Sequence, residues 1–381
     1  MPKVLLKDVV ARIKDKVDKD STNLEYYIGG EHFDYAEVCI TKRGVIQGST
    51  IGPAFHMHFM PGDVLLMSRN PHLRKAGVVD FEGICSDVSY VCRTKDESVL
   101  MQRYLPFVFQ TDHFWEFAER NKKGSTNFFL NWSDFEKYEF DLPGIEEQRK
   151  VTELLWAAQD TKMAYQELLR QSDELVKSQF IEIIDKGNYS LVKAGSVMSS
   201  LRNGLSPSTS GTHFEKVLTL SAITQGEFDP EACKSGSFDE VPPPDKRISC
   251  QDFYICRGNG NKQLVGSGVF SAEDRLDLVF PDTVIAAKVD NTRILLHYLY
   301  VAWKQPFVRE QIEKGARTTN GTYKINQKII CDVSFPLPPM NVQREFLHTI
   351  TQFDKSKFEL KQSIANITAL MKSLMQQDFS N

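Results

Sequence analysis

The sequence lacks the features of a membrane or secreted protein. No apolar run approaches the roughly 18 residues that cross a membrane, and charge interrupts the N-terminal MPKVLLKD too early for a signal peptide. The seven cysteines are scattered and contain no C-x-x-C pair, which argues against a zinc ribbon or a disulfide framework. We therefore expect a cytoplasmic protein.

Motifs for catalysis and metal binding are also missing from the sequence. It has no G-x-x-x-x-G-K-[ST], no G-x-S-x-G and no H-E-x-x-H. His56 and His58, with Cys39 or His72, are too loosely spaced to favour a metal site over ordinary surface or core histidines. We predict no catalytic residues, no metal and no cofactor, in a chain that is not an enzyme.

The sequence has no excess of positive charge. Its 46 Lys and Arg residues are outnumbered by 50 Asp and Glu residues, which gives a formal net charge of −4. A protein that binds nucleic acid by its overall charge would be basic, so composition offers no support for such binding. Any nucleic-acid surface would have to be a local patch.

One stretch of the sequence occurs twice. LPGIEEQR occupies residues 142–149 and LPPMNVQR occupies residues 337–344, an offset of 195 (337 minus 142). Each copy opens a long helical pattern, the first from residue 144 to about 183 and the second from 342 to 379. The simplest interpretation is an internal duplication in which each copy carries a globular part and one long helix.

Both helical patterns carry an apolar seam in alternating steps of four and three residues. This spacing is the heptad signature of helices that pair side by side. Lys162 and Lys357 interrupt the two seams at the same step, so we predict that the helices pair with each other, in an antiparallel coiled coil if one globular part lies at each end. The seam residues are Val151, Leu155, Ala158, Tyr165, Leu169 and Val176 in the first helix, and Phe346, Ile350, Phe353, Leu360, Ile364, Ile367 and Met371 in the second.

The two globular parts repeat each other loosely. Short β-like runs separated by Gly and Pro predict a mixed α/β arrangement in each. Residues 251–259 mirror residues 62–70, and residues 315–321 stand in the place of 120–127. The predicted fold class is α+β, with globular domains at 1–141 and 186–336 and spacer helices at 142–185 and 337–381.

Each globular part contains two polar loops. Arg, Lys, Asn and Gln side chains can read base edges, and Ser, Thr and Lys commonly bind phosphates. The same residues are also what ordinary loops are made of. The candidate DNA-binding residues are Arg69, Asn70, Arg74, Lys75, Lys122, Lys123 and Asn127 in the first domain, and Arg257, Asn259, Asn261, Lys262, Gln263, Arg317, Thr318, Asn320 and Lys324 in the second.

The whole layout resembles the specificity (S) subunit of type I restriction-modification systems. The duplicated L-P…Q-R helix starts and the matched strand ends at 62–70 and 251–259 carry the resemblance. It implies two target recognition domains that each read one half of a bipartite site in double-stranded DNA. It also implies an antiparallel coiled coil that docks two methyltransferase subunits, with restriction subunits added in a cleaving complex. The first copy departs from the usual L-P-P, because Gly144 replaces the second proline.

The helix length offers a physical reason for such a layout. A helix of about 37 residues spans ~55 Å, or about 16 base pairs, which leaves room for two half-sites and an unread spacer. Two alternatives stay open from the residues alone. One is a non-enzymatic adaptor whose coiled coil joins two protein-binding domains, and the other is an enzyme with an unrecognised site in the glycine-rich regions.

Overall fold

The computed structural model describes residues 2–319 and 321–379. It divides the chain into two compact units. Unit 1 takes residues up to 168 together with those from 360 onward, and unit 2 takes residues 169–359. Each unit therefore combines a globular stretch with part of both long helices.

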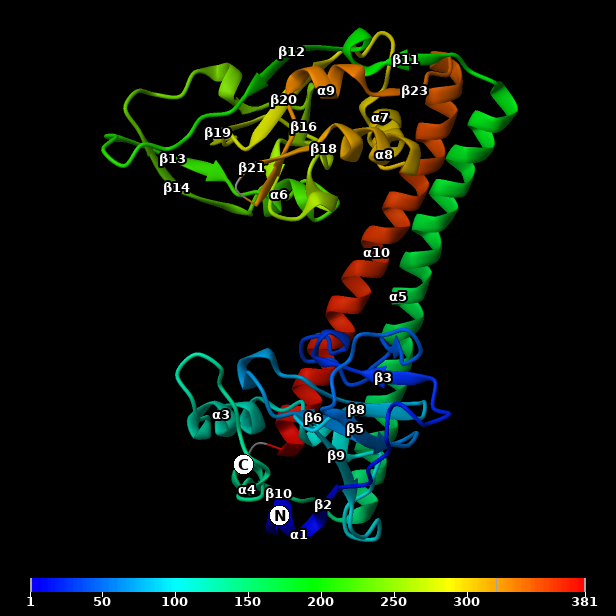
Figure 1. Ribbon diagram of the computed structural model, residues 1–381, viewed down its shortest axis with the longest axis vertical. Helices are drawn as coiled ribbons and strands as arrows, with labels where there is room; N and C mark the ends of the chain where they lie inside the picture. Colours follow the sequence, from blue (N-terminus) through cyan, green and yellow to red (C-terminus); the bar gives the residue numbers. More distant parts are fainter. Residues whose placement is uncertain (1, 320, 380–381) are drawn as a thin grey trace. The chain divides into compact units, whose positions relative to one another are not determined.

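Unit 1 contains two four-stranded sheets (Figure 1). The first runs in the order β2 (Val10–Ile13), β9 (Ser89–Thr94), β6 (Val64–Met67) and β7 (Ala76–Val78), and is antiparallel throughout. The second runs in the order β4 (Gly44–Val45), β3 (Tyr26–Ile28), β8 (Gly83–Ser86) and β5 (Phe55–Phe59). In this second sheet β3 and β8 are parallel and the other pairs are antiparallel.

Unit 2 repeats this topology strand for strand. Its first sheet has the order β12 (Met198–Asn203), β20 (Val284–Val289), β16 (Asp252–Cys256) and β18 (Gly268–Phe270). Its second has the order β14 (Cys233–Phe238), β13 (His213–Leu218), β19 (Arg275–Val279) and β15 (Arg247–Ile248), again with one parallel pair, β13 with β19. The duplication inferred from the sequence is therefore visible in the order and direction of the strands.

A short antiparallel pair joins each globular part to its long helix. In unit 1 it is β1 (Lys3–Leu5) with β10 (Glu139–Asp141), and in unit 2 it is β11 (Leu191–Lys193) with β23 (Ser334–Pro336). The remaining helices are short. They are α1 (Leu6–Val9), α2 (Leu105–Val108), α3 (Asp112–Asn121) and α4 (Trp132–Phe135) in unit 1, and α6 (Ser221–Thr224), α7 (Leu296–Trp303), α8 (Pro306–Gly315) and α9 (Gln327–Asp332) in unit 2.

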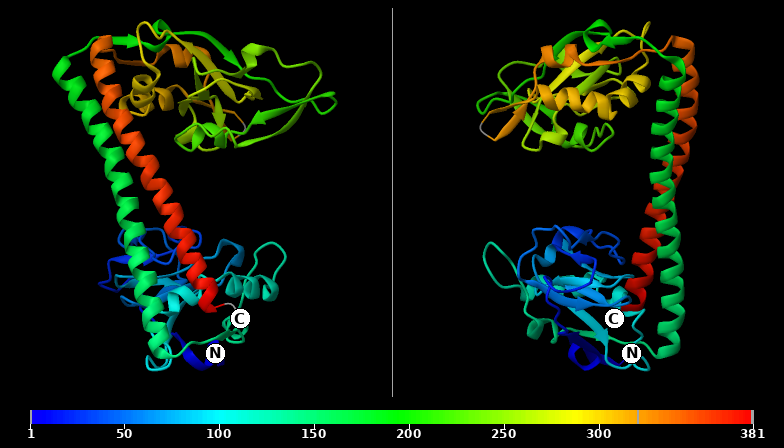
Figure 2. Two further views of the ribbon diagram at one scale, coloured as in Figure 1. Left: turned by 180° about the vertical axis from the view of Figure 1, so that it is seen from behind. Right: turned by 45° about the vertical axis from the view of Figure 1, so that its right-hand side comes forward.

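The two long helices are α5 (Ile145–Gly187, 43 residues) and α10 (Met340–Phe379, 40 residues). In unit 1 the start of α5 packs on the end of α10, where Val151 and Leu155 share a core with Met371. In unit 2 the end of α5 packs on the start of α10, where Val176 shares a core with Phe346. The two helices lie side by side there in Figures 1 and 2. The helices are therefore antiparallel, and every residue of the predicted seam is buried or half-buried.

Gln148, in the first L-P…Q-R motif, fastens the start of α5 to the globular part of unit 1. Its side chain is fully buried. Its Nε2 donates to the carbonyl oxygens of Val99 and Pro143, both at 2.8 Å, and its Oε1 accepts from the N–H of Met101 at 3.0 Å. This one amide satisfies three backbone groups, including a carbonyl next to the helix start.

Gln343 does the same for α10 in unit 2. Its Nε2 donates to the carbonyl oxygens of Arg293 at 3.0 Å and Pro338 at 2.8 Å, and its Oε1 accepts from the N–H of Leu295 at 2.8 Å. Since 343 is 148 plus 195, the repeated glutamine of the motif has one structural role in both copies. It sets where each long helix leaves its globular part.

The lysines that interrupt the seam differ in their partners. Lys162 is buried, and its Nζ donates to both carboxylate oxygens of Glu37 at 2.7 Å, so it ties α5 to the globular part of unit 1. Lys357 instead pairs with Asp173 of α5 at 2.5 Å, so it ties the two helices together in unit 2. The lysine at the same seam position therefore joins a helix to a globular part in unit 1 and joins the two helices in unit 2.

The residue with a left-handed backbone at the end of α5 is an asparagine rather than a glycine. Gly187 is the last helical residue, and Asn188 carries the positive φ of 44°. A Cβ at Gly187 would lie 2.1 Å from the ring of Tyr189, so a larger residue there would require this ring to move. Among the described residues, no helix is both long and apolar enough to cross a membrane.

Candidate nucleic-acid interface

The structure brings the two predicted polar loops of unit 2 together. β21 (Arg317–Thr319) and β22 (Thr322–Lys324) form a hairpin, and β22 also pairs with β17 (Gly258–Asn259). Asn259 lies opposite Tyr323, so the end of the central sheet and the hairpin form one small three-stranded sheet. Two loops 60 residues apart in sequence thus become one surface (317 minus 257).

The hairpin of unit 2 places two cations opposite each other. Arg317 and Lys324 are directly paired across the strands and both are exposed. Like charges at such positions repel and destabilise a hairpin. Within the described part of the chain neither has a carboxylate within ion-pair distance, so the pair is an unneutralised site suited to an anion such as a phosphate. Thr318, opposite Tyr323, is also exposed, and Asn320 lies outside the described residues.

The loop after β17 is shaped by its own asparagines. The Oδ1 of Asn259 accepts from the N–H of Asn261 at 2.9 Å, and the Oδ1 of Asn261 accepts from the N–H of Gln263 at 3.0 Å. These bonds occupy one side-chain oxygen each and fix a short 3-10 turn at Lys262–Leu264, where Lys262 and Gln263 are exposed. Asn259 and Asn261 therefore fix the conformation of the loop in which Lys262 and Gln263 are exposed.

Arg257 points inward rather than into this surface. It is half-buried and donates to the carbonyl oxygen of Asp282 at 3.2 Å, while its own carbonyl accepts from the N–H of Ile325 at 2.9 Å. Its counterpart in unit 1 is Ser68, whose carbonyl accepts from Leu130 at 2.9 Å. The structural equivalent of Asn259 is Asn70, so the two arginines that look matched in sequence, Arg69 and Arg257, occupy different positions.

Unit 1 forms the same surface with a looser hairpin. Lys123 and Phe129 exchange two backbone hydrogen bonds, of 2.8 and 3.0 Å, and the N–H of Asn70 donates to Phe128 at 2.9 Å. Gly124, at φ +93°, makes the turn. Arg69 is exposed with its guanidinium 5.4 Å from the centre of the Phe129 ring, and Asn127 is exposed at the hairpin.

The cations of unit 1 differ from those of unit 2 because most of them are already paired. Lys122 contacts Glu119 and Lys123 contacts Asp134, each at 2.6 Å. The hydrogen bond from Lys123 is the main reason that the pKa of Asp134 is lowered. A phosphate would have to compete with these carboxylates for the lysines.

Arg74 and Lys75 are similarly engaged in unit 1. Arg74, in the left-handed region at φ 46°, forms an ion pair with Asp112, which Lys372 of α10 also contacts at 3.0 Å. Its hydrogen bond, with that of Lys372, lowers the pKa of Asp112. Lys75 donates to the carbonyl oxygen of Gly30 at 2.6 Å. Both side chains are half-buried. Among the described candidates of unit 1, Arg69, Lys123 and Asn127 are exposed, and of these three Lys123 is held by a carboxylate.

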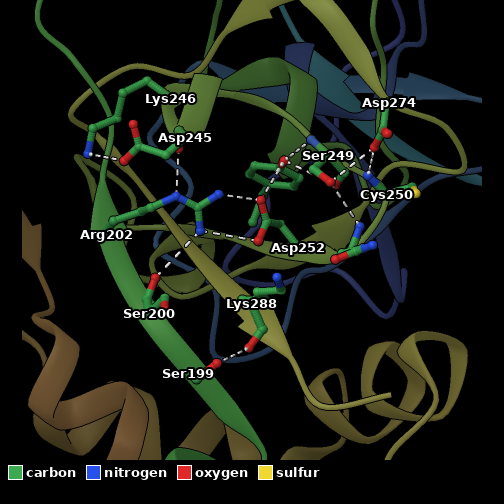
Figure 3. A network of polar contacts seen from close by, with 12 residues as sticks. Ser199, Ser200, Arg202, Asp245, Lys246, Ser249, Cys250, Asp252, Asp274 and Lys288 are labelled. Carbon is green, nitrogen blue, oxygen red and sulfur yellow. Dashed lines mark hydrogen bonds and ion pairs between the residues drawn. The ribbon is translucent and has the colours of Figure 1, made fainter. Parts of the chain in front are cut away.

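A buried carboxylate lies at the start of the central strand of each unit, at the strand end opposite to the polar loops. Asp252, 2% exposed, begins the central strand of unit 2 and receives a two-pronged bond from Arg202 of β12, as Figure 3 shows. Asp63, also 2% exposed, precedes the central strand of unit 1 and receives one from Arg93 of β9. The sequence match at these aspartates was recognisable, but their arginines come from different strands, and nothing in the sequence identifies them.

The described residues contain no group of three or more His, Cys, Asp or Glu side chains placed to hold a metal ion. The polar network in Figure 3 is instead satisfied from within. Asp274 accepts from the hydroxyl of Ser249 at 3.0 Å and from the N–H of Cys250 at 2.8 Å, and Arg202 also donates to the carbonyl oxygen of Asp245 at 2.6 Å. These bonds brace the start of the central strand β16.

Comparison with known proteins identifies the fold through structure alone. No family model and no curated protein matches the sequence. The S subunit of a type I restriction-modification system from M. genitalium matches with a TM-score of 0.57 at 12% identity, covering 100% of this chain and 96% of that one. A chain from a study of complex assembly and conformational transition of the type I R-M system matches with a TM-score of 0.53 at 18% identity, covering 99% and 97%. The chain therefore has the fold of type I S subunits over its whole length.

Proposed function

We propose that this chain is the DNA-recognition subunit of a type I restriction-modification complex. The observation that carries the proposal is the pair of equivalent surfaces, one per unit, each built from a strand end and a hairpin on a scaffold with the S-subunit fold. Each globular domain, 1–141 and 186–336, reads one half of a bipartite site in double-stranded DNA. The chain itself is non-catalytic and needs no cofactor, since methylation and cleavage belong to partner subunits.

The contacts divide into positioning and reading roles. The facing cations Arg317 and Lys324 of unit 2 bind phosphate, and Arg69 does so in unit 1. Exposed amides such as Asn127 and Gln263 have the donor and acceptor pair that reads adenine. Asn70 and Asn259 occupy equivalent positions in the two surfaces. Each joins the end of the central strand to the hairpin, Asn70 through Phe128 and Asn259 through Tyr323.

The long helices act as the spacer and as the docking site for partners. Their 43 and 40 residues correspond to about 65 and 60 Å at ~1.5 Å per residue. Two methyltransferase subunits dock along them, and restriction subunits join in a cleaving complex. The net charge of −4 is compatible with this role if partner subunits neutralise much of the DNA phosphate charge. Because the proposed substrate of the complex is genomic DNA, the complex acts in the cytoplasm.

The test is to map methylated bases by single-molecule sequencing in cells that co-express the methyltransferase, with and without this chain. We expect a two-part methylation motif that disappears when the chain is deleted. An unchanged motif would contradict the proposal. The adaptor alternative predicts instead that the complex of this chain with its methyltransferase shows no salt-dependent retention on DNA.

The spacer role has its own test. Inserting four residues, about one helical turn, next to Lys162 in α5 and next to Lys357 in α10 keeps the two seams matched in length. We expect the unread spacing of the methylation motif to change while both half-sites stay the same. A changed half-site would show that the helices do more than set a distance.

A further inference from the structure

The polar loop 261–265 of unit 2, in which Lys262 and Gln263 are exposed, is held by an arginine of α8. The Nη2 of Arg309 donates to the carbonyl oxygen of Gln263 at 2.7 Å and to that of Val265 at 2.9 Å. One nitrogen therefore bonds to two carbonyl groups of the loop. Arg309 lies 46 residues from Gln263 in the sequence, so no local pattern identifies the pair.

Arg309 is too enclosed to serve as a DNA contact itself. Its side chain is 19% exposed, and its Nη1 is buried without a hydrogen-bond partner among the described residues. Since Nη2 is engaged by the loop, neither terminal nitrogen is available to a phosphate. Burial lowers the pKa of Arg309, against the raising effect of Glu313. Taking a charge out of water costs free energy that its partners only partly return, so stability alone gives little reason for an arginine here.

The helix that carries Arg309 is itself firmly placed. Val308 and Ile312 of α8 are fully buried in the core of unit 2. Gln311 exchanges two hydrogen bonds with the backbone of Ser334 in β23, both at 2.8 Å. The loop also packs closely on α8, because a Cβ at Gly266, whose φ is +74°, would lie 2.4 Å from the Ile312 side chain. Arg309 therefore ties the loop to a fixed element.

Unit 1 has a tie between the corresponding loop and helix, with the charges reversed. There the cation belongs to the loop, since Arg74 directly follows the 3-10 turn Pro71–Leu73 and forms an ion pair with Asp112 of α3. In unit 2 the cation belongs to the helix and its acceptors belong to the loop. Both copies thus fasten the loop that follows the central strand, although the residues that do so are not repeated in the sequence.

We propose that Arg309 is a positioning residue for base reading by unit 2. By holding the carbonyl groups of Gln263 and Val265, it fixes the direction in which Lys262 and Gln263 meet the DNA, and it does so without touching a base. An amide reads adenine through two atoms at once, so it discriminates only when both atoms are aligned with the base edge. This inference rests on the proposed role of the chain in DNA recognition.

The test is single-molecule sequencing of methylated bases in cells that express the full complex with Arg309→Met, which keeps an unbranched stem and removes the donors. We expect one half-site to lose discrimination about fivefold or more at one or two positions. The same positions should relax in the loop variant Lys262→Ala with Gln263→Ala. The other half-site should stay sharp, which shows that the complex assembles. Arg309→Lys should relax these positions less, because a single nitrogen can still donate to both carbonyl groups.

The matched control is Arg293→Met in the same unit. The Nη1 of Arg293 donates to the carbonyl oxygen of Ser196 at 2.6 Å. Ser196 lies just before β12, at the sheet end where the central strand begins, so it is remote from the polar loops. This variant removes the same charge and a similar hydrogen bond to the backbone. It should leave both half-sites unchanged.

Three results would overturn the proposal. Arg309→Met could leave the motif as in the wild type, it could relax positions other than those of the loop variant, or Arg293→Met could relax the motif equally. If Arg309→Met gave no methylation, the comparison would be made with Arg309→Lys, whose motif must then relax at the positions of the loop variant. A wild-type complex without a two-part motif would instead contradict the proposed function, so the two failures are distinguishable.

Discussion

The two units share a scaffold, but the cations of their hairpins differ in whether they form ion pairs with carboxylates. In unit 2, Arg317 and Lys324 face each other without a carboxylate partner among the described residues. In unit 1, Lys122 and Lys123 are held by Glu119 and Asp134. Strand order, direction and the buried aspartates are the same in both units. A duplicated fold has kept its frame and changed its exposed polar side chains, as expected if each copy recognises a different target.

The shared frame is concentrated where the long helices begin. Gln148 and Gln343 make the same three hydrogen bonds in the two units. The seam lysines are the exception, because Lys162 pairs with a globular domain and Lys357 with the other helix. This comparison leads to four predictions, from the largest expected effect to the smallest.

The first prediction tests the shared helix start. Gln148→Leu and Gln343→Leu should each lower the free energy of unfolding by about 3 kcal/mol, because each leaves three backbone groups buried without a partner. Urea unfolding monitored by circular dichroism measures the loss, and the exposed Gln352→Leu on α10 is the control, with a change below about 0.5 kcal/mol. If only one of the two substitutions lowered the free energy of unfolding by this amount, the two glutamines would not have equivalent roles.

The second prediction separates the two seam lysines. The Lys162 side chain is 9% exposed and that of Glu37 is 28% exposed, whereas the partner of Lys357, Asp173, is 61% exposed. Lys162→Met should cost about 1–2 kcal/mol because it leaves a partly buried carboxylate alone, and Lys357→Met should cost less than about 0.5 kcal/mol. Equal losses in the same urea experiment would contradict the different roles assigned to them.

The third prediction concerns DNA affinity. Arg317→Ala removes a cation that has no carboxylate partner among the described residues, so it should weaken binding by the complex about fivefold and reduce the salt slope of log K by about 1. Lys123→Ala should have a smaller effect, since Asp134 already neutralises this lysine. Fluorescence anisotropy across a salt series measures both, with the exposed Lys186→Ala at the end of α5 as the control. If log K fell with salt at the same slope for Arg317→Ala and Lys123→Ala, the proposed electrostatic difference between the units would be contradicted.

The fourth prediction is a difference in pH dependence between equivalent strands. In unit 1, His58 of β5 contacts Asp15 at 2.9 Å and Glu82 at 2.8 Å. Burial alone would lower the pKa of His58, but these hydrogen bonds outweigh it and raise the pKa above 6.5. In unit 2, the equivalent strand β15 carries Arg247, paired with Glu215 at 2.8 Å, whose charge does not change near neutral pH.

A raised pKa in the folded state means that the stabilisation by His58 is fully present below pH 6.5 and is lost as the pH rises through the folded value. His58→Gln should therefore remove a small fall in unfolding free energy above pH 6.5. Arg247→Gln should leave that fall in place. Urea unfolding between pH 6 and 9 tests both, and an unchanged pH profile for His58→Gln would refute the assignment.

The sequence predicted the frame better than the surface. The L-P…Q-R repeat and the four-three spacing of the seam predicted two long paired helices, because periodic burial leaves a direct trace in the residue pattern. The antiparallel pairing and the α+β duplication are confirmed by the structure. The spacing could not reveal that the repeated glutamine holds the helix start, since two of its three partners lie 47 to 50 residues away.

The candidate DNA-binding residues remain a prediction, and the structure shows why sequence alone could not rank them. Lys123 and Arg317 look alike in a polar loop, yet Asp134 lies beside one and Lys324 beside the other. Such pairings depend on contacts between strands and short helices that no local pattern encodes. The Arg202–Asp252 and Arg93–Asp63 braces were missed for the same reason.

The central claim is that each unit reads its own half of a bipartite DNA site. The most direct test is single-molecule sequencing of methylated bases in cells that carry the wild-type chain, the unit 1 variant Arg69→Ala with Asn127→Ala, or the unit 2 variant Arg317→Ala with Lys324→Ala. We predict that each variant relaxes one half of the methylation motif and that the two variants relax opposite halves. If both variants relax the same half, or neither changes the motif, the claim is contradicted.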